Sequence, residues 1–398
     1  MTEQRFSPIN RWLLPEGIDE LLPPRAAELE RLRRQLLDLF SSWGYELIMP
    51  PFIEFLDSLL TGTGHDLDLQ TFKITDQLSG RLMGVRADMT PQAARIDAHQ
   101  LRREQPARLC YIGTVLRTRP DTIGGSRDPV QVGAELFGHA GVESDIEVIS
   151  LMLEVLAAAG ISTPHLDLGH VGIFRSLMAQ AQLTPAAESD LFDALHRKAS
   201  GEIDALLSVM QVPLSVREML AALSELHGGI DVLAEAAERL RQANGEVQDA
   251  LRNLQQVAAA IQRRFPALPL HFDLAELRGY RYHTGIVFAA FAPGYGRELA
   301  RGGRYDAIGR VFGGSRPATG FSADLKALSI LGQREPTQSS GIFVVWGDAP
   351  ELLAEVDRLR RAGERVIWGL PGQIGSAADM GCDRQLVATN GSWQIVPV

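Results

Sequence analysis

A long stretch with helical spacing divides two groups of strand-like segments, and this arrangement limits the possible folds more than any other feature. From 173 to 265 the sequence is rich in Ala, Leu, Glu, Gln and Arg, with few strand formers. Strand patterns precede it at 107–117 and 129–138, and further strand patterns follow it at 270–274, 285–291 and 298–300. The pattern predicts an α+β protein in which a helical insertion, at about 173–265, separates two parts of one sheet.

The two ends of the chain add further elements. Apolar residues at spacings of three and four predict a helix over 23–43, which Gly44 ends, and Pro50-Pro51 then forces an extended chain. The polar segment 333–340 is the expected linker. Residues 341–398 alternate strand and helix patterns and end in a hairpin, which predicts a small α/β domain.

Composition and charge exclude several classes of protein. The formal net charge is −10, from 49 acidic and 39 basic residues, which disfavours a general nucleic-acid binder. The two cysteines, Cys110 and Cys382, lie in no metal-binding or disulfide pattern, so we expect no metal site. No apolar run approaches membrane-spanning length and the N-terminus lacks an apolar signal region, so we expect a cytoplasmic protein.

Polar residues in the predicted strand 129–138 indicate a binding pocket. Gln131, Gly133 and Glu135 share one face of this strand because strand side chains alternate. A Gln and a Glu that point together from a central strand are costly in a plain core. Gly133 between them is expected to leave room for a ligand or for a crossing backbone.

Four sequence motifs together resemble one enzyme family. The helix that ends at Gly44 and Pro50-Pro51 resembles motif 1 of the class II aminoacyl-tRNA synthetases, and Arg108–Arg117 (RLCYIGTVLR) resembles motif 2. The strings Arg278–Tyr282 and Gly302–Asp306 (GGRYD) resemble two blocks of the histidyl enzymes. The resemblance implies that residues 1–332 form a class II synthetase-like antiparallel sheet core. It also implies that 341–398 is a shortened anticodon-binding domain.

The resemblance also implies a histidine-binding site. Asp88 and Thr90 would hold the ammonium group, Arg117 the carboxylate, and Gln131 the amino-acid backbone. Glu135 would read the imidazole ring beside the pocket residue Tyr282, while Arg278 matches a cationic catalytic group of the histidyl enzymes. The complete expected set is Asp88, Thr90, Arg117, Gln131, Glu135, Arg278 and Tyr282.

Three departures fall where these synthetases bind ATP. Arg119 stands in place of the motif 2 glutamate, Asp324 in place of a glycine, and Ala327 in place of the motif 3 arginine. Adenylyl transfer depends on positioned cations around the phosphates, so their loss should cost several powers of ten in rate. The departures therefore predict a chain with no catalytic residues and no cofactor.

A histidyl-synthetase-like chain without an ATP site resembles the family of regulatory subunits of ATP phosphoribosyltransferase. That resemblance implies a non-catalytic subunit that joins a short catalytic chain in a hetero-oligomer. It also implies self-association as a dimer through motif 1, free histidine as ligand, and neither nucleic acid nor membrane as partner. Two alternatives remain. One is an active histidine-activating ligase that uses Lys326 or Arg119 in new roles, and the other is a synthetase-like RNA-binding module.

Overall fold

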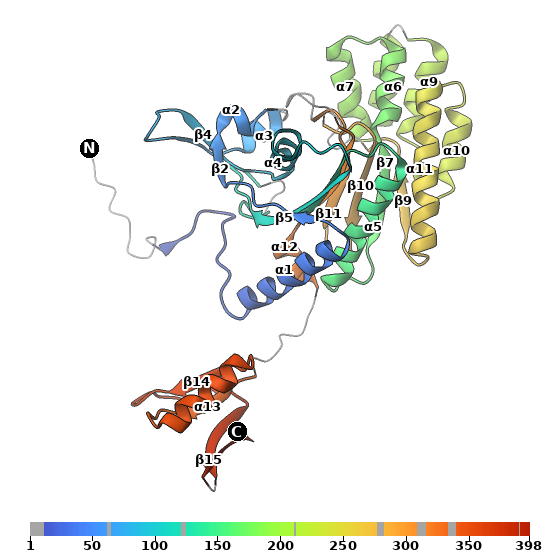
Figure 1. Cartoon of the computed structure of the whole chain (residues 1–398). Coiled ribbons are helices and arrows are strands. Elements are labelled where there is room, and N and C mark those ends of the chain that lie inside the picture. Colours follow the sequence, from blue (N-terminus) through green and yellow to red (C-terminus); the bar gives the residue numbers. More distant parts are fainter. Residues whose placement is uncertain are drawn as a thin grey trace. The chain divides into compact units, whose positions relative to one another are not determined.

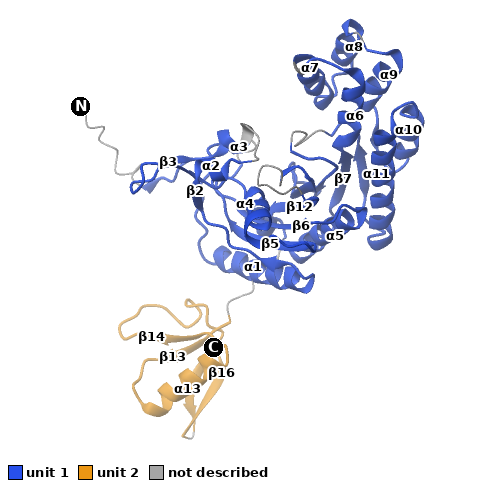
Figure 2. Cartoon of the chain, turned by 45° about the horizontal axis from the view of Figure 1, so that its top comes forward, with its two compact units in different colours: residues 1–333 blue, residues 334–398 orange. Residues whose placement is uncertain are grey.

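The computed structural model describes residues 12–61, 65–120, 125–210, 212–276, 282–308, 316–332, 340–389 and 391–398. The chain divides into two compact units, residues 1–333 and 334–398, coloured blue and orange in Figure 2. Most of the expected linker, 333–340, lies outside the described residues. Each unit is built around its own sheet.

A nine-stranded sheet forms the centre of the first unit (Figure 1). In spatial order its strands are β1 (Glu46–Leu47), β5 (Ala107–Thr114), β6 (Val130–Phe137), β12 (Ala318–Asp324), β11 (Ala300–Arg304), β10 (Ile286–Phe291), β7 (His165–His170), β9 (Leu270–Asp273) and β8 (His227–Gly228). Within the run from β5 to β7, each adjacent pair of strands is antiparallel, whereas β1 pairs with β5 and β9 pairs with β7 in parallel. The predicted α+β class, with a largely antiparallel sheet at its centre, is confirmed.

Helices α1 (Arg25–Ser42), α5 (Val142–Ala158) and α12 (Leu325–Leu331) pack beside this sheet. Leu32, Leu36 and Phe40 repeat every four residues along α1 and are buried in the core. The chain leaves α1 through Gly44, whose φ of +78° suits glycine. The apolar stripe of α1 is therefore used within the chain.

The segment between β7 and β9 is helical apart from the short strand β8. Its helices are α6 (Val171–Ala181), α7 (Pro185–His196), α8 (Ser200–Val209), α9 (Leu214–Leu223), α10 (Val232–Arg239) and α11 (Gly245–Arg264). In Figure 1 they are coloured green to yellow. Helices α6 and α11 pack on β7 and β10 and share the main hydrophobic core, so this segment is continuous with the core.

A small three-stranded sheet with order β2-β4-β3 lies between α1 and β5 in the sequence. The elements here are β2 (Ile53–Phe55), α2 (Leu56–Leu59), α3 (His65–Gln70), β3 (Lys73–Thr75), β4 (Leu82–Val85), α4 (Thr90–Arg95) and the π-helix η2 (Ile96–Leu101). Residues 86–89, between β4 and α4, carry part of the candidate site.

Three local predictions from the sequence need correction: a capping box that opens a helix at Ser144, a turn at Gly302-Gly303, and a helix that begins near Ser322. Helix α5 begins at Val142, so Ser144 lies inside its first turn and is not the start of a capping box. Gly302 and Gly303 lie within β11 rather than in a turn, because both pair with β10 and β12, and a Cβ at Gly302 would clash with the Gly320 carbonyl oxygen and the ring of Phe288. The expected helix near 322–331 begins only at Leu325, because β12 continues to Asp324.

The second unit is a small α/β fold, as predicted. Its strands, in spatial order, are β14 (Val366–Gly369), β13 (Ile342–Val345), β15 (Arg384–Thr389) and β16 (Ser392–Pro397). Helix α13 (Pro350–Arg361) connects the parallel strands β13 and β14. Leu352, Val356 and Leu359 of this helix pack on Ile342 and Val344.

Candidate functional site

Glu135, near the middle of β6, is the most deeply buried of the expected ligand-binding residues. Its side chain is 1% exposed. The Tyr111 hydroxyl donates a hydrogen bond of 2.8 Å to Oε1, and the Tyr305 hydroxyl donates to Oε2. Gly320 lies opposite on β12, and a Cβ there would lie 1.5 Å from Oε2. The carboxyl group therefore occupies a space that only glycine leaves open.

The surroundings of Glu135 favour its neutral form. Burial raises the pKa of Glu135 to about 8, and the charge of Asp88 acts in the same direction. Hydrogen bonds from Tyr305, Tyr111 and Thr90 oppose this increase because they stabilise the carboxylate. A strongly perturbed acid in a polar cluster is typical of a functional site.

Asp88, Thr90 and Gln131 form a second cluster beside it. Gln131 is 4% exposed; its Nε2 donates to Asp88 Oδ1 at 2.8 Å, and its Oε1 accepts from the Met89 backbone N–H at 2.9 Å. Asp88 Oδ1 also accepts from the Thr90 backbone N–H at 2.9 Å. The Thr90 hydroxyl lies 3.1 Å from that of Tyr111, so the two clusters are connected.

Tyr282 joins this cluster from the segment before β10. Its ring stacks on Tyr305 with centroids 5.1 Å apart. Burial, followed by the charges of Glu135 and Asp88, raises the pKa of its phenol well above the usual value. Among the described residues the buried Tyr282 hydroxyl has no hydrogen-bond partner, which makes it available to a ligand.

Of the two arginines expected in the site, the structure describes only Arg117. Arg117 Nε donates to the Ala87 carbonyl at 3.3 Å, which places it next to Asp88. Burial raises the pKa of Asp324, and the charge of Arg117 is among the causes that oppose this rise. Arg278 lies outside the described residues. The structure thus brings Asp88, Thr90, Gln131, Glu135 and Tyr282 into one cluster, with Arg117 at the adjoining loop.

The sequence analysis did not identify Tyr111, Tyr305 and Gly320, and the space expected at Gly133 is taken by the Tyr111 ring and the backbone oxygen of Phe321 rather than by a ligand. The Tyr111 ring fills the space at Gly133, where a Cβ would lie 2.5 Å from the phenol oxygen. Tyr111 and Gly133 are direct cross-strand partners, so a tyrosine opposite a glycine was the available signal. Tyr305 lies within the GGRYD string but was given no role, and Gly320 carried no signal that a single sequence reveals.

Thr284 connects the two downstream motifs. Its backbone N–H donates to the Arg304 carbonyl at 2.7 Å, and its hydroxyl accepts from the Asp306 N–H at 2.9 Å. Asp306 Oδ1 also accepts from the Ala318 N–H at 2.9 Å. These bonds hold Tyr305 and the segment of Tyr282 beside Glu135.

The charged residues in the region expected to bind ATP make contacts within the chain. Lys326 Nζ lies 2.8 Å from Asp128 Oδ2, and both side chains are largely buried. Asp324 accepts from the Lys326 N–H at 3.0 Å and so caps α12, while burial raises the pKa of its carboxyl. Arg119 is exposed. Asp324 and Lys326 therefore have structural roles here.

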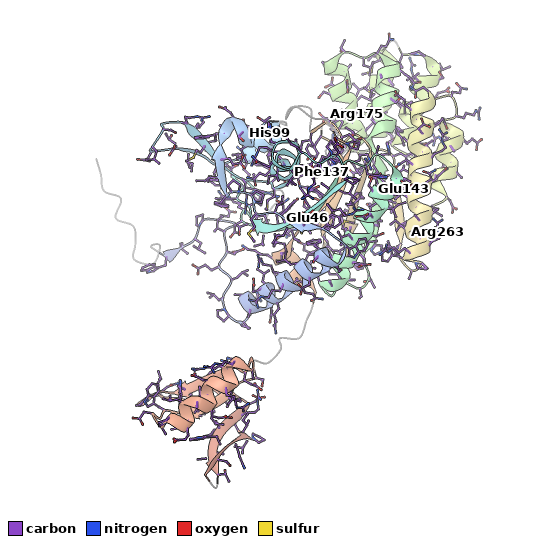
Figure 3. The ribbon with its side chains drawn as sticks, in the orientation of Figure 1. Glu46, His99, Phe137, Glu143, Arg175 and Arg263 are labelled. Atoms are coloured by element: carbon purple, nitrogen blue, oxygen red, sulfur yellow. The ribbon has the colours of Figure 1, made fainter. Side chains whose placement is uncertain are left out.

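Two features of the structure bear on membrane and metal-binding classes of protein. No helix among the described residues is long and apolar enough to cross a membrane. Within the same residues, no group of three or more His, Cys, Asp or Glu side chains could hold a metal ion. Figure 3 shows the side chains of the described residues; Phe137 is buried and Arg263 on α11 is exposed.

Family models match nearly the whole chain in two parts. The model for histidyl-tRNA synthetase matches residues 17–328. The model for the C-terminal domain of the ATP phosphoribosyltransferase subunit HisZ matches residues 339–396. Among solved structures, an ATP phosphoribosyltransferase regulatory subunit/histidyl-tRNA synthetase from Bacillus halodurans is 25% identical. It has a TM-score of 0.81, with 93% of this chain and 96% of that one covered.

Curated relatives agree over the full length. The ATP phosphoribosyltransferase regulatory subunit of Alkalilimnicola ehrlichii is 63% identical, with 100% of both chains covered. That of Thioalkalivibrio sulfidiphilus is 62% identical over 95% of this chain and 96% of its own length. A histidyl-tRNA synthetase from a Nostoc species, 18% identical with a TM-score of 0.77 and 97% of each chain covered, shares the fold. The chain therefore belongs to the family of ATP phosphoribosyltransferase regulatory subunits, non-catalytic proteins built on the fold of histidyl-tRNA synthetase.

Proposed function

We propose that this chain activates a separate, short catalytic ATP phosphoribosyltransferase subunit in the cytoplasm and relays inhibition by free histidine to it. The activity of that complex is the first step of histidine biosynthesis. The observation that carries the proposal is the contrast within one site. Around Glu135, where the amino acid would bind, the polar side chains are connected, and among the described residues the buried Tyr282 hydroxyl has no hydrogen-bond partner. Where ATP would bind, Asp324 caps α12 and Lys326 forms an ion pair with Asp128, so both have structural roles.

Free histidine fits the polar groups of the cluster. Its ammonium group needs acceptors, which Asp88 and Thr90 supply, and its carboxylate suits the planar fork of Arg117. The imidazole ring would lie against Glu135 and the phenol of Tyr282. Gln131 would contact the amino-acid backbone, and Arg278 remains assigned through the family resemblance alone. A few charge-assisted hydrogen bonds of roughly 1.5–3 kcal/mol each are enough for micromolar binding.

Self-association is proposed at the motif 1 region, Leu29–Pro51, and its continuation into β2. The apolar stripe of α1 is buried within the chain, so that stripe cannot supply the contact. Leu47, Met49, Phe52 and Ile53 are instead 42–77% exposed, and β1 is an edge strand of the main sheet. Exposed apolar residues beside an open edge favour a two-fold contact between copies of this chain.

The two alternatives gain less support. A ligase that recruits Lys326 would have to break its ion pair with Asp128. An RNA-binding role would have to use residues 341–398, which carry five basic and seven acidic residues.

Reconstitution tests the proposal. The purified chain is mixed with the short catalytic subunit, and formation of phosphoribosyl-ATP is measured with and without histidine. We expect activity to require this chain and to fall when histidine is added. Equal activity with and without the chain would refute the regulatory role. Activity that needs the chain but ignores histidine would reduce it to an activator.

A further inference from the structure

The carboxyl group of Glu135 is buried among neutral donors. Its two oxygens accept from the hydroxyl groups of Tyr111 and Tyr305, and its side chain is 1% exposed. Burying a carboxylate without a cation is costly, and neutral hydroxyl groups offset that cost only in part. The described residues that contact this carboxyl group are neutral hydroxyl donors, and with its burial they favour a proton on it when no ligand is present.

The groups that face Glu135 come from every part of the site. Among the described residues they are Tyr111 on β5, Thr90 at the start of α4, Tyr305 after β11 and Tyr282 before β10, with Asp88 acting on Glu135 through its charge. Gly320 on β12 contributes only space. Asp88, the charged member of this set, has the same sign as an ionised Glu135 and therefore further favours the neutral acid.

We propose that the empty site stores one proton on Glu135, that Tyr111 and Tyr305 are positioning residues for this acid, and that an incoming imidazole shares the stored proton. The inference rests on the proposed binding of histidine. As the ring binds, the proton lies between a Glu135 oxygen and an imidazole nitrogen, and near neutral pH none is exchanged with solvent. If the ring bound without this proton, Glu135 would remain an ionised carboxylate buried among neutral hydroxyl groups, which is costly.

The sign of the pH dependence follows from two requirements. The free imidazole must be neutral, which holds above its pKa of about 6.5. Glu135 must be protonated, which holds below its pKa of about 8. Binding should therefore be tightest at about pH 7, should release protons on the acid side, and should take up protons on the alkaline side.

Calorimetry in buffers of different ionisation enthalpy measures these protons directly. Above about pH 8 we expect the wild-type chain to take up close to one more proton per histidine than Glu135→Gln does. The histidine ammonium group also titrates there, but it contributes equally to both proteins, so the difference isolates Glu135. Equal proton counts in the two proteins would overturn the inference while leaving histidine binding intact.

Tyr305→Phe distinguishes a positioning role from simple packing. The hydroxyl stabilises the ionised carboxyl, so its removal should raise the pKa of Glu135 further and move the alkaline decline in affinity to higher pH. Tyr45→Phe is the matched control, because the Tyr45 hydroxyl donates to Glu147 outside the site. An unchanged profile in Tyr305→Phe would contradict its assignment.

Infrared spectroscopy of the empty chain supplies a readout that needs no ligand. At pH 7 we expect a protonated-carboxyl band that disappears in Glu135→Gln and fades in the wild-type chain as the pH passes about 8. If this band is present but histidine does not bind at any pH, the proposed function is wrong, while the protonation of Glu135 is still supported. If histidine binds and the band is absent, the inference alone is wrong.

Discussion

Glu135 on β6 and Lys326 on α12 are both largely buried ionisable residues, yet their partners differ in kind. Lys326 lies 2.8 Å from the carboxylate of Asp128, so its charge is compensated within the chain. Glu135 accepts from two neutral phenols, and its pKa rises to about 8. A buried charge beside an opposite charge is compensated within the chain, whereas a buried acid among neutral donors is favoured in its protonated form. The difference separates a charge with a structural partner from an acid that we propose as a ligand-binding residue.

The largest expected effect concerns the ATP side. The purified chain with histidine, ATP and magnesium should show no histidine-dependent ATP–pyrophosphate exchange, because Arg119, Asp324 and Ala327 replace groups that handle ATP. One positioned donor alone is worth ~10²–10³ in rate, so the deficit should exceed a hundredfold. An active histidyl-tRNA synthetase assayed in parallel is the control. An exchange rate within a hundredfold of that enzyme's rate would show that the ATP-binding region is functional, and the contrast with the amino-acid region would be lost.

The second effect concerns ligand affinity. Glu135→Ala should weaken histidine binding by about 1.5–3 kcal/mol, roughly ten- to a hundredfold, because it removes the ring contact. Arg117→Ala should weaken binding through the histidine carboxylate. Lys326→Met is the matched control on the other side and should leave affinity unchanged, since its partner is Asp128. Calorimetry measures all three. Unchanged affinity in both Glu135→Ala and Arg117→Ala would mean that these residues are structural.

The smallest effect concerns the space around Glu135. A Cβ at position 320 would lie 1.5 Å from Glu135 Oε2 and 2.8 Å from the Ala134 carbonyl oxygen, so Gly320→Ala must displace the acid. We expect a loss of about 1–3 kcal/mol in the free energy of unfolding, as for other overpacked positions. Gly296→Ala meets no atom within 4 Å and serves as the control. Thermal and denaturant unfolding measure the difference, and equal stability of the two variants would show that β12 relaxes without cost.

Local patterns in the sequence predicted much of the fold. The 3.6-residue period identified α1 and the helices between β7 and β9, and strand patterns identified β5 and β6. The period of two placed Gln131 and Glu135 on one face, which required no knowledge of the neighbouring strands. Element boundaries were less certain, as the start of α5 at Val142 and that of α12 at Leu325 show, because strand pairing and packing decide them.

By itself, the sequence determined the chemistry that this chain carries: an acid and an amide on one face of β6, and altered residues where a synthetase binds ATP. Only the tertiary structure decided how those groups are used. Tyr111 and Tyr305 are separated by 194 positions, and they meet at Glu135 because β5 and β12 pair with β6, and β11 pairs with β12. The pairing of Lys326 with Asp128 also joins distant segments. Whether a buried charge is compensated depends on such contacts, and no local pattern encodes them.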